Sequence, residues 1–306
     1  MDCLYSIIIA TRNNELTIKH VLRSTLIVAK KYETELIVVD GNSVDSTPRI
    51  VEKYTEENKS YYTSLKVLRD PGFSLSFARH LGFKNSQGNV LIFLDGDTLL
   101  TSSFKYYLEK ELEDADLISL TPIYASLDKA TSIFNDFMKV LSYMVVSAIR
   151  GRRILDPSIF PPARIYKREV LERLKGYPVS SRFLGEDKIV TALAVRLGFR
   201  YKFSTRLKLL KIDNPGYCSY WRKHYRYSLG LHKDVTPFGK NILRGYIVSR
   251  RAGHVNVVVP IISIIYALNS YRYLKDFGKS INIALMKYFI DVAMFLGDLI
   301  GAFTRK

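Results

Sequence analysis

The sequence predicts an α/β fold with a mostly parallel sheet flanked by helices. Three observations support this prediction: short runs of apolar, β-branched residues, apolar residues at helical spacing between those runs, and polar turns where the runs end. Short apolar runs without polar alternation are typical of parallel strands that are buried on both faces. Strands that alternate with helices along a chain usually pair in parallel, so helices are expected on both faces of the sheet.

The elements of the first half follow in order. Four runs have the composition of buried strands: Ser6–Ala10, Glu35–Asp40, Leu65–Leu68 and Asn89–Leu94. After the first run, apolar residues recur along one face of a helix: Ile18, Leu22, Leu26 and Ala29. Pro48 suits the first turn of the next helix, because its nitrogen needs no hydrogen bond there. A helix is expected over Phe77–Asn85, and a further strand over Leu117–Pro122.

The composition excludes several classes of protein. Of the 306 residues, 47% are hydrophobic, which is enough for a sizeable core and argues against a disordered chain. Cys3 and Cys218 are the only cysteines, so there is no disulfide framework and no zinc-finger spacing. A reducing compartment is therefore expected. The first residues lack a basic segment followed by a long apolar one, so no signal peptide is predicted.

Positive charge is concentrated in the last third of the chain. Residues 1–199 contain 27 Lys and Arg against 24 Asp and Glu, a net charge of +3. Residues 200–306 contain 19 against 5, a net charge of +14. Such a balance indicates an anionic partner, and nucleic acid, anionic lipid and phosphorylated substrates are the candidates.

Two apolar segments lie in this basic third, at Val255–Leu268 and Ile281–Phe303. The first is short for a membrane span, and the second contains Lys287, Asp291 and Asp298, which would be costly at the centre of a bilayer. Interfacial or re-entrant helices are therefore favoured over a transmembrane hairpin or a soluble oligomer interface. We predict two domains: residues 1–230 for binding and catalysis, and residues 231–306 as a membrane-associated helical region.

An acidic motif follows the fourth strand. Asp95, Gly96 and Asp97 come directly after the apolar run Val90–Leu94, and Asp40 ends the second strand. Ligands of parallel α/β sheets bind at the carboxyl ends of the strands. Two carboxylates one residue apart can converge on Mg²⁺ or Mn²⁺, which prefer oxygen ligands and bridge to substrate phosphates. The motif alone is weak evidence, but its position after a strand strengthens it.

Four motifs, in order along residues 5–200, give the chain a family resemblance. They are Ser6–Glu15 (SIIIATRNNE), Glu35–Thr47 (ELIVVDGNSVDST), Phe77–Thr98 with its FARHLG and GNVLIFLDGDT sequences, and Gly185–Asp187 (GED). The sequence resembles family-2-type inverting glycosyltransferases with a GT-A fold, which include polyprenyl-phosphate sugar synthases and polysaccharide glycosyltransferases. The resemblance implies a Rossmann-like sheet that binds a nucleotide-sugar donor, together with a divalent cation.

The resemblance also implies residue roles. Donor-binding roles fall to seven residues: Thr11, Glu15, Asp40, Arg79, Asp95, Arg222 and Arg226. Asp95 and Asp97 would bind the metal, and Glu186 would orient the acceptor site. Asp187 is the expected general base, which would take the proton of an acceptor hydroxyl. Two alternatives stay open: an acidic pair that only stabilises a helix N-terminus, and, for Arg222 and Arg226, a solvated or lipid-facing basic surface.

The predicted function is therefore inverting transfer of a sugar from a UDP- or GDP-linked donor to an acceptor hydroxyl or lipid phosphate. A lipid-linked or glycan acceptor and a location at the cytoplasmic face of the membrane, peripheral or re-entrant, are expected. One alternative is a nucleotidyltransferase of related fold, although the absence of glycine between Met1 and Asp40 argues against its phosphate loop. The other is a non-enzymatic basic protein that binds nucleic acid or membrane.

Overall fold

A computed structural model describes residues 4–125, 136–137, 140, 162–178, 185–212, 221–222, 224–229, 254, 256–258 and 260–303. The chain forms two compact units. The first comprises Met1–Ile123, Pro161–Arg182 and Glu186–Ile212, and the second comprises Tyr124–Phe160, Phe183–Gly185 and Asp213–Lys306. The predicted boundary between residues 230 and 231 lies outside the described residues and stays a prediction.

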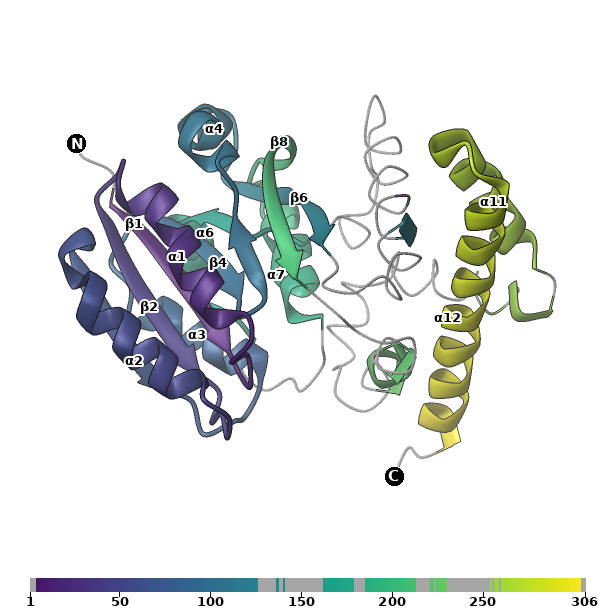
Figure 1. Cartoon of the computed structure of the whole chain (residues 1–306), viewed down its shortest axis with the longest axis horizontal. Helices are drawn as coiled ribbons and strands as arrows, with labels where there is room; N and C mark the ends of the chain where they lie inside the picture. The colour runs from purple at the N-terminus through teal and green to yellow at the C-terminus, as the bar shows by residue number, and fades with distance from the viewer. Residues whose placement is uncertain are drawn as a thin grey trace. The chain divides into compact units, whose positions relative to one another are not determined.

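The first unit is built on one sheet of eight strands (Figure 1). Their order is β3 (Ser64–Arg69), β2 (Thr34–Asp40), β1 (Tyr5–Thr11), β4 (Val90–Asp95), β7 (Ile165–Lys167), β6 (Leu117–Ala125), β8 (Tyr201–Ile212) and β5 (Thr98–Leu100). The strands β3, β2, β1 and β4 pair in parallel, as the sequence predicts. The pairs β4–β7, β7–β6 and β5–β8 are antiparallel, so the second half of the sheet differs from the expected parallel pattern.

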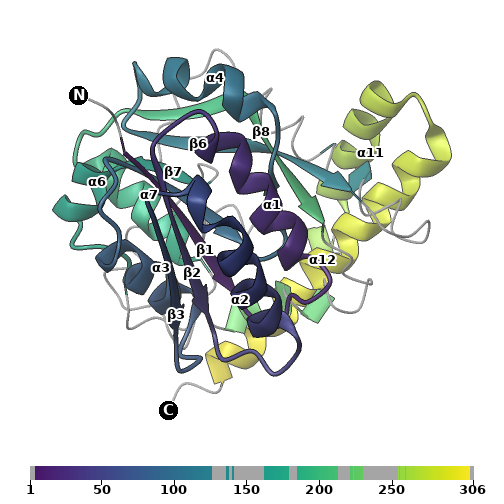
Figure 2. The same ribbon diagram turned by 60° about the vertical axis from the view of Figure 1, so that its left-hand side comes forward.

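Helices cover both faces of the sheet (Figure 2). One face carries α1 (Ile18–Ala29), α2 (Thr47–Asn58), which continues into a 3₁₀ turn at Lys59–Tyr61, and α4 (Ser103–Leu112). The other carries α3 (Leu75–Lys84), α6 (Arg168–Arg173) and α7 (Glu186–Arg196). Side chains alternate across a strand, so Ile7 and Ile9 of β1 join the first core and Ile8 joins the second. The predicted α/β fold with flanking helices is confirmed.

The described part of the second unit contains two long helices, α11 (Ile261–Leu274) and α12 (Phe277–Phe303). They pack against each other, and Lys275 takes a left-handed backbone conformation with φ 56° in the turn between them. A small core forms at this unit from Phe137, Val140 and residues of α12 such as Ile283. Among the described residues, no helix combines the length and apolar character needed to cross a membrane.

Candidate active site

The carboxyl ends of β1, β2 and β4 bring three predicted site residues to one edge of the sheet. The strand register pairs Thr11 with Asp40 and Ala10 with Asp95. Thr11 and Asp40 are almost fully buried, and the Asp95 side chain is one-fifth exposed. The predicted convergence of strand-end residues therefore occurs at the position where α/β sheets bind ligands.

The loops after β1 and β2 hold each other through reciprocal hydrogen bonds. The backbone nitrogen of Glu15 donates to Asp45 Oδ2 at 3.1 Å, and the nitrogen of Ser46 donates to Glu15 Oε2 at 3.0 Å. The nitrogen of Asn13 donates to Ser43 Oγ at 2.9 Å. The carboxylate of Glu15 thus fixes the β2 loop to the β1 loop, and its predicted donor contact stays a prediction.

Asp40 shapes the turn that follows its strand. Its Oδ2 accepts from the backbone nitrogen of Ser43 at 3.0 Å, and its Oδ1 accepts from the Ser43 hydroxyl at 2.5 Å. Each carboxylate oxygen can accept a second hydrogen bond. The predicted contact of Asp40 with a base or ribose would therefore add to these bonds without replacing them.

Gly96 fits a space in which no side chain can stand. A Cβ on this residue would lie 2.4 Å from Asn14 Oδ1 and 2.5 Å from Thr11 Oγ1. The Gly96 nitrogen donates to the carbonyl of Ala10 at 3.0 Å, and Thr17 Oγ1 donates to the Gly96 carbonyl at 2.7 Å. The turn between the two aspartates is therefore clamped against the loop after β1, which fixes where Asp97 emerges.

Asp97 is about as exposed as Asp95 but has different partners. Its Oδ2 lies 3.3 Å from Lys211 Nζ, and its Oδ1 accepts from Thr98 Oγ1 at 2.9 Å. Lys211 comes from β8, a strand that the sequence reasoning missed although the charged–apolar alternation of Arg206–Leu209 is a strand signal. Lys211 therefore enters the site through an antiparallel pairing of β8 with β5.

The residues fit the predicted metal in part. No group of three or more His, Cys, Asp or Glu side chains that could hold a metal occurs in the described part of the chain. Mg²⁺ and similar ions need only one or two carboxylates when substrate phosphates and water supply the other ligands. Asp97 suits this role better than Asp95, because Asp97 faces one lysine and a hydroxyl, whereas both oxygens of Asp95 face arginine side chains.

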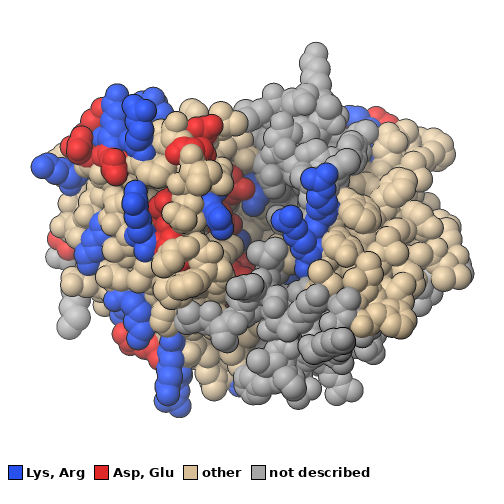
Figure 3. Space-filling view, turned by 90° about the horizontal axis from the view of Figure 1, so that it is seen from below, with Lys and Arg blue, Asp and Glu red and all other residues tan. Residues whose placement is uncertain are grey.

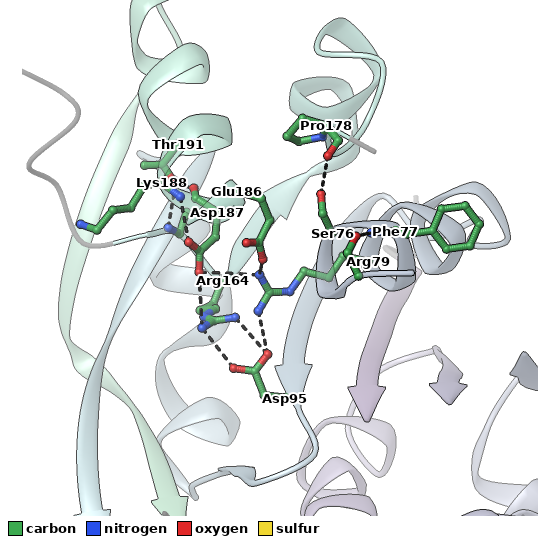
Figure 4. Close-up of polar contacts among 12 residues, drawn as sticks. Ser76, Phe77, Arg79, Asp95, Arg164, Pro178, Glu186, Asp187, Lys188 and Thr191 are labelled. Atoms are coloured by element: carbon green, nitrogen blue, oxygen red, sulfur yellow. Dashed lines mark hydrogen bonds and ion pairs between the residues drawn. The ribbon is translucent and has the colours of Figure 1, made fainter. Parts of the chain in front are cut away.

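Arg79 of α3 joins the motif after β4 to the start of α7 (Figure 4). Its guanidinium donates to Asp95 Oδ1 at 2.7 Å and to Glu186 Oε1, and it lies 3.6 Å from Asp187 Oδ2. Its side chain is 1% exposed. Arg79, which the sequence predicts as a donor-binding residue, therefore connects three acidic residues of the predicted site.

Arg164, just before β7, is a second cation of the same cluster. Its Nη2 lies 3.2 Å from Asp95 Oδ2 and 3.6 Å from Asp187 Oδ2. Figure 4 shows the two guanidinium groups next to each other, both in contact with the Asp95 carboxylate. No motif or periodicity marks Arg164 in the sequence, because the antiparallel β4–β7 pairing that brings it here is a long-range contact.

Ion pairing keeps Asp95 and Arg79 in their charged forms. Burial would raise the pKa of Asp95, but the charges of Arg164 and Arg79 lower this pKa well below its usual range. Burial would likewise lower the pKa of Arg79, but the carboxylates of Asp95, Glu186 and Asp187 raise it well above its ordinary value. Three carboxylates against two guanidinium groups leave one net negative charge (−3 + 2 = −1).

The first turn of α7 carries the predicted acceptor-site pair. Glu186 is 2% exposed and is held by Arg79. The Asp187 side chain is 15% exposed, and its Oδ1 accepts from the nitrogen of Lys188 at 2.9 Å. Acidic residues here also suit the positive end of the helix dipole. Of these two acids, Asp187 is therefore the more exposed, and its carboxylate faces Arg79 and Arg164.

Arg222 and Arg226, the other predicted donor contacts, belong to the second unit. Both are exposed and helical, and they lie four residues apart, so they share one face of their helix. Their predicted contact with the donor diphosphate stays a prediction.

The fold and the strand-end acidic site define a GT-A-type glycosyltransferase. The model of the family "Glycosyl transferase family 2" matches residues 6–175, more than half of the chain, so the protein belongs to that family. The resemblance predicted from the sequence motifs is thereby confirmed.

Relatives of known sequence agree with this assignment. The chain is 24% identical over 240 residues to "Probable glycosyltransferase YdaM" of Bacillus subtilis, covering 76% of this chain and 56% of that protein. It is 28% identical over 135 residues to "Minor teichoic acid biosynthesis protein GgaA" of the same organism, covering 41% and 29%. The chain thus spans about half or less of the length of these relatives.

Solved structures share the fold. The mannosyltransferase PcManGT from Pyrobaculum calidifontis, in complex with GDP-Man and Mn²⁺, has a TM-score of 0.59 at 16% identity, covering 98% of this chain and 88% of that one. Residues 1–349 of S. aureus TarS, in complex with UDP-GlcNAc, have a TM-score of 0.52 at 16% identity, covering 96% and 89%. At these identities the likeness supports the fold alone.

Proposed function

We propose that the protein transfers a sugar, with inversion, from a UDP- or GDP-linked donor to an acceptor at a membrane surface. The observation that carries the proposal is the buried Arg79, which joins the Asp95 motif to the Glu186–Asp187 pair. The motif of Asp95 and Asp97 suits a donor diphosphate, and the Glu186–Asp187 pair suits an acceptor. The solved GT-A structures with GDP-Man or UDP-GlcNAc support this donor class.

The residues divide the work as follows. Asp187 takes the proton of the acceptor hydroxyl while the oxygen of that hydroxyl bonds to the anomeric carbon, and the bond from that carbon to the diphosphate breaks. This single displacement forms no covalent enzyme intermediate, so it inverts the anomeric centre. Asp97 is the residue that would hold Mg²⁺ or Mn²⁺, and such an ion supplies positive charge to the departing diphosphate.

The same site can serve two kinds of acceptor. A hydroxyl is a weak nucleophile and needs the base, whereas a lipid phosphate is already ionised at neutral pH and needs none. Arg164, whose side chain is about one-fifth exposed, is the cation of this cluster that an anionic acceptor can contact, whereas Arg79 is buried. GgaA is named for teichoic acid biosynthesis, which supports an acceptor class at a cell surface.

The test is the Asp187→Asn variant, which keeps the shape of the side chain but cannot accept a proton. For a hydroxyl acceptor we expect turnover to fall at least about 10²-fold with donor affinity nearly unchanged. Asp114→Asn is the matched control, since Asp114 is an exposed acid of the first unit. The measurement is product formation from a panel of nucleotide sugars with Mn²⁺. Unchanged turnover with hydroxyl acceptors would remove Asp187 from the chemistry.

A further inference from the structure

The helices α11 and α12 leave many apolar side chains exposed. Figure 3 shows few charged side chains over this part of the molecule. Six side chains here are each at least half exposed: Val258 just before α11, Ile261, Ile264 and Leu268 of α11, and Leu285 and Phe289 of α12. Exposed apolar side chains that gather on one pair of helices mark an interaction site more often than single scattered ones do. We call these six side chains the outer face of the hairpin, and this face requires a partner.

Polar residues of the same helices point inward and satisfy one another. Asp291 is fully buried and is paired with Lys287, four residues earlier on α12. The side-chain nitrogen of Asn256 donates to Asp291 Oδ2 at 2.7 Å and to Ser263 Oγ at 2.8 Å, and the Ser263 nitrogen donates to Asn256 Oδ1 at 3.0 Å. These polar groups therefore impose no cost on the outer face.

A second polar layer lies two helical turns further along α12. Asp298 Oδ2 lies 2.8 Å from His254 Nε2, and Asp298 Oδ1 accepts from Ser228 Oγ. Residues seven apart share a helix face, so Asp291 and Asp298 mark the same inner side of α12. The two acids that made the segment look unsuited to an apolar environment are thus internal.

Three of the four charged side chains at the turn of the hairpin are basic. Arg272, Lys275 and Lys279 are exposed there, beside the partly buried Asp276. Lys279 lies 3.7 Å from Asp136 and 4.0 Å from Asp276. An apolar face with basic residues at one end is the pattern of helices that lie in a bilayer interface and contact anionic headgroups.

We propose that the outer face of the α11–α12 hairpin lies in the interface of an anionic membrane, with the basic turn at the headgroups. A second copy of the chain fits this surface less well. A copy that docked through the same region would bring few acids to meet the basic turn, since residues 200–306 contain 19 basic and 5 acidic residues. Two of those acids, Asp291 and Asp298, are paired inside the hairpin unit. A nucleic acid would leave the apolar face uncovered.

This proposal extends the membrane part of the proposed function, and its test needs no donor or acceptor. The full chain would be floated with vesicles of phosphatidylcholine alone and of an equimolar mixture with phosphatidylglycerol. We expect binding to the anionic vesicles, weaker binding to the neutral ones, and partial release in high salt. If the chain does not bind vesicles, the proposal of sugar transfer is unaffected. If the chain binds vesicles but transfers no sugar, only the proposed function is wrong.

Two sets of variants separate the apolar and basic contributions. Ile264→Ser with Leu268→Ser should weaken binding at least about tenfold to both vesicle types, because less apolar area is buried. Arg272→Ser with Lys275→Ser should weaken binding to anionic vesicles by roughly 25-fold, about fivefold per charge. The matched controls are Tyr106→Ser and Lys53→Ser, which change exposed residues of α4 and α2.

A further variant guards against loss of folding. Phe289→Trp keeps an apolar side chain at an exposed position, and its added fluorescence should be quenched by brominated lipids in anionic vesicles. Light scattering of the wild type and of each variant without lipid gives their molecular masses, which tests whether a second copy of the chain covers the outer face. Three results would each overturn the proposal. The full chain could stay unbound, or the Ile264→Ser, Leu268→Ser variant could bind vesicles as the wild type does. The wild type could also be a dimer that the Ile264→Ser, Leu268→Ser variant converts to a monomer.

Discussion

Arg79 offers the sharpest test of how the site is held together. Replacing it by methionine removes the guanidinium that holds Glu186, and it leaves Asp95 and Asp187 with Arg164 as their remaining arginine partner. The charge of the cluster changes from −1 to −2. Breaking a buried ion pair by removing one partner costs about 3–5 kcal/mol, because the other charge stays buried without compensation. This is a large part of the roughly 5–15 kcal/mol that stabilises a typical domain.

The expected readout for Arg79→Met is thermal unfolding. A cost of about 3–5 kcal/mol corresponds to a fall in Tm of roughly 6–20 °C for a domain of this size. Arg206→Met is the matched control, because Arg206 is half exposed and its ion pair with Glu111 spans 3.9 Å, so it should cost less than about 1 kcal/mol. Adding Glu186→Met to Arg79→Met should recover part of the loss, since the double variant no longer buries the Glu186 carboxylate beside the missing guanidinium.

The pH dependence has a defined sign. The pKa of Asp95 lies below its unfolded value of about 3.9, so its contribution to stability is fully present above that pH and is lost as the pH falls through the folded pKa. Loss of Arg79 raises the pKa of Asp95. As the pH falls, Asp95 in the variant therefore takes up a proton at a higher pH than Asp95 in the wild type, which removes an uncompensated buried charge. The gap in Tm between wild type and Arg79→Met should therefore narrow from pH 7 toward pH 4. The reasoning is refuted if the variant melts within a few degrees of wild type, or if the double variant is less stable than the single one.

The remaining predictions concern the turn after β4. Gly96→Ala should destabilise the protein by about 1–3 kcal/mol, because the new Cβ would lie 2.4 Å from Asn14 Oδ1 and 2.5 Å from Thr11 Oγ1. Urea unfolding measures this cost, and a stability equal to wild type would show that the turn can move. Asp97→Ala should abolish the response of activity to Mn²⁺, which chelation and metal add-back would reveal in the wild type. Full metal-dependent activity in Asp97→Ala would place the metal on other residues.

The parallel half of the sheet could be predicted because each of its strands is encoded locally. β1, β2 and β4 are continuous apolar runs that need no information about their partners, and α1 is marked by its own helical spacing. The acids that end β2 and β4 then fall at one edge as a consequence of parallel pairing. Asp40, Asp95 and Asp97 were therefore accessible to sequence reasoning.

The antiparallel half was not accessible in the same way. The described strand β7 has three residues, and its position is set by pairing with β4 and β6, which lie far from it in the sequence. Arg164 consequently has no local signal, although it contacts both Asp95 and Asp187. Lys211 reaches Asp97 by the same kind of long-range pairing.

The apolar C-terminal segments show the same division between local and tertiary information. The sequence by itself determined that they are apolar, basic at their ends and interrupted by Asp291 and Asp298. Only the tertiary structure decided that those acids face inward, because their partners Asn256, His254 and Ser228 come from other segments of the chain. Composition and periodicity are local properties, whereas the partner of a buried charge depends on which segments the fold brings together.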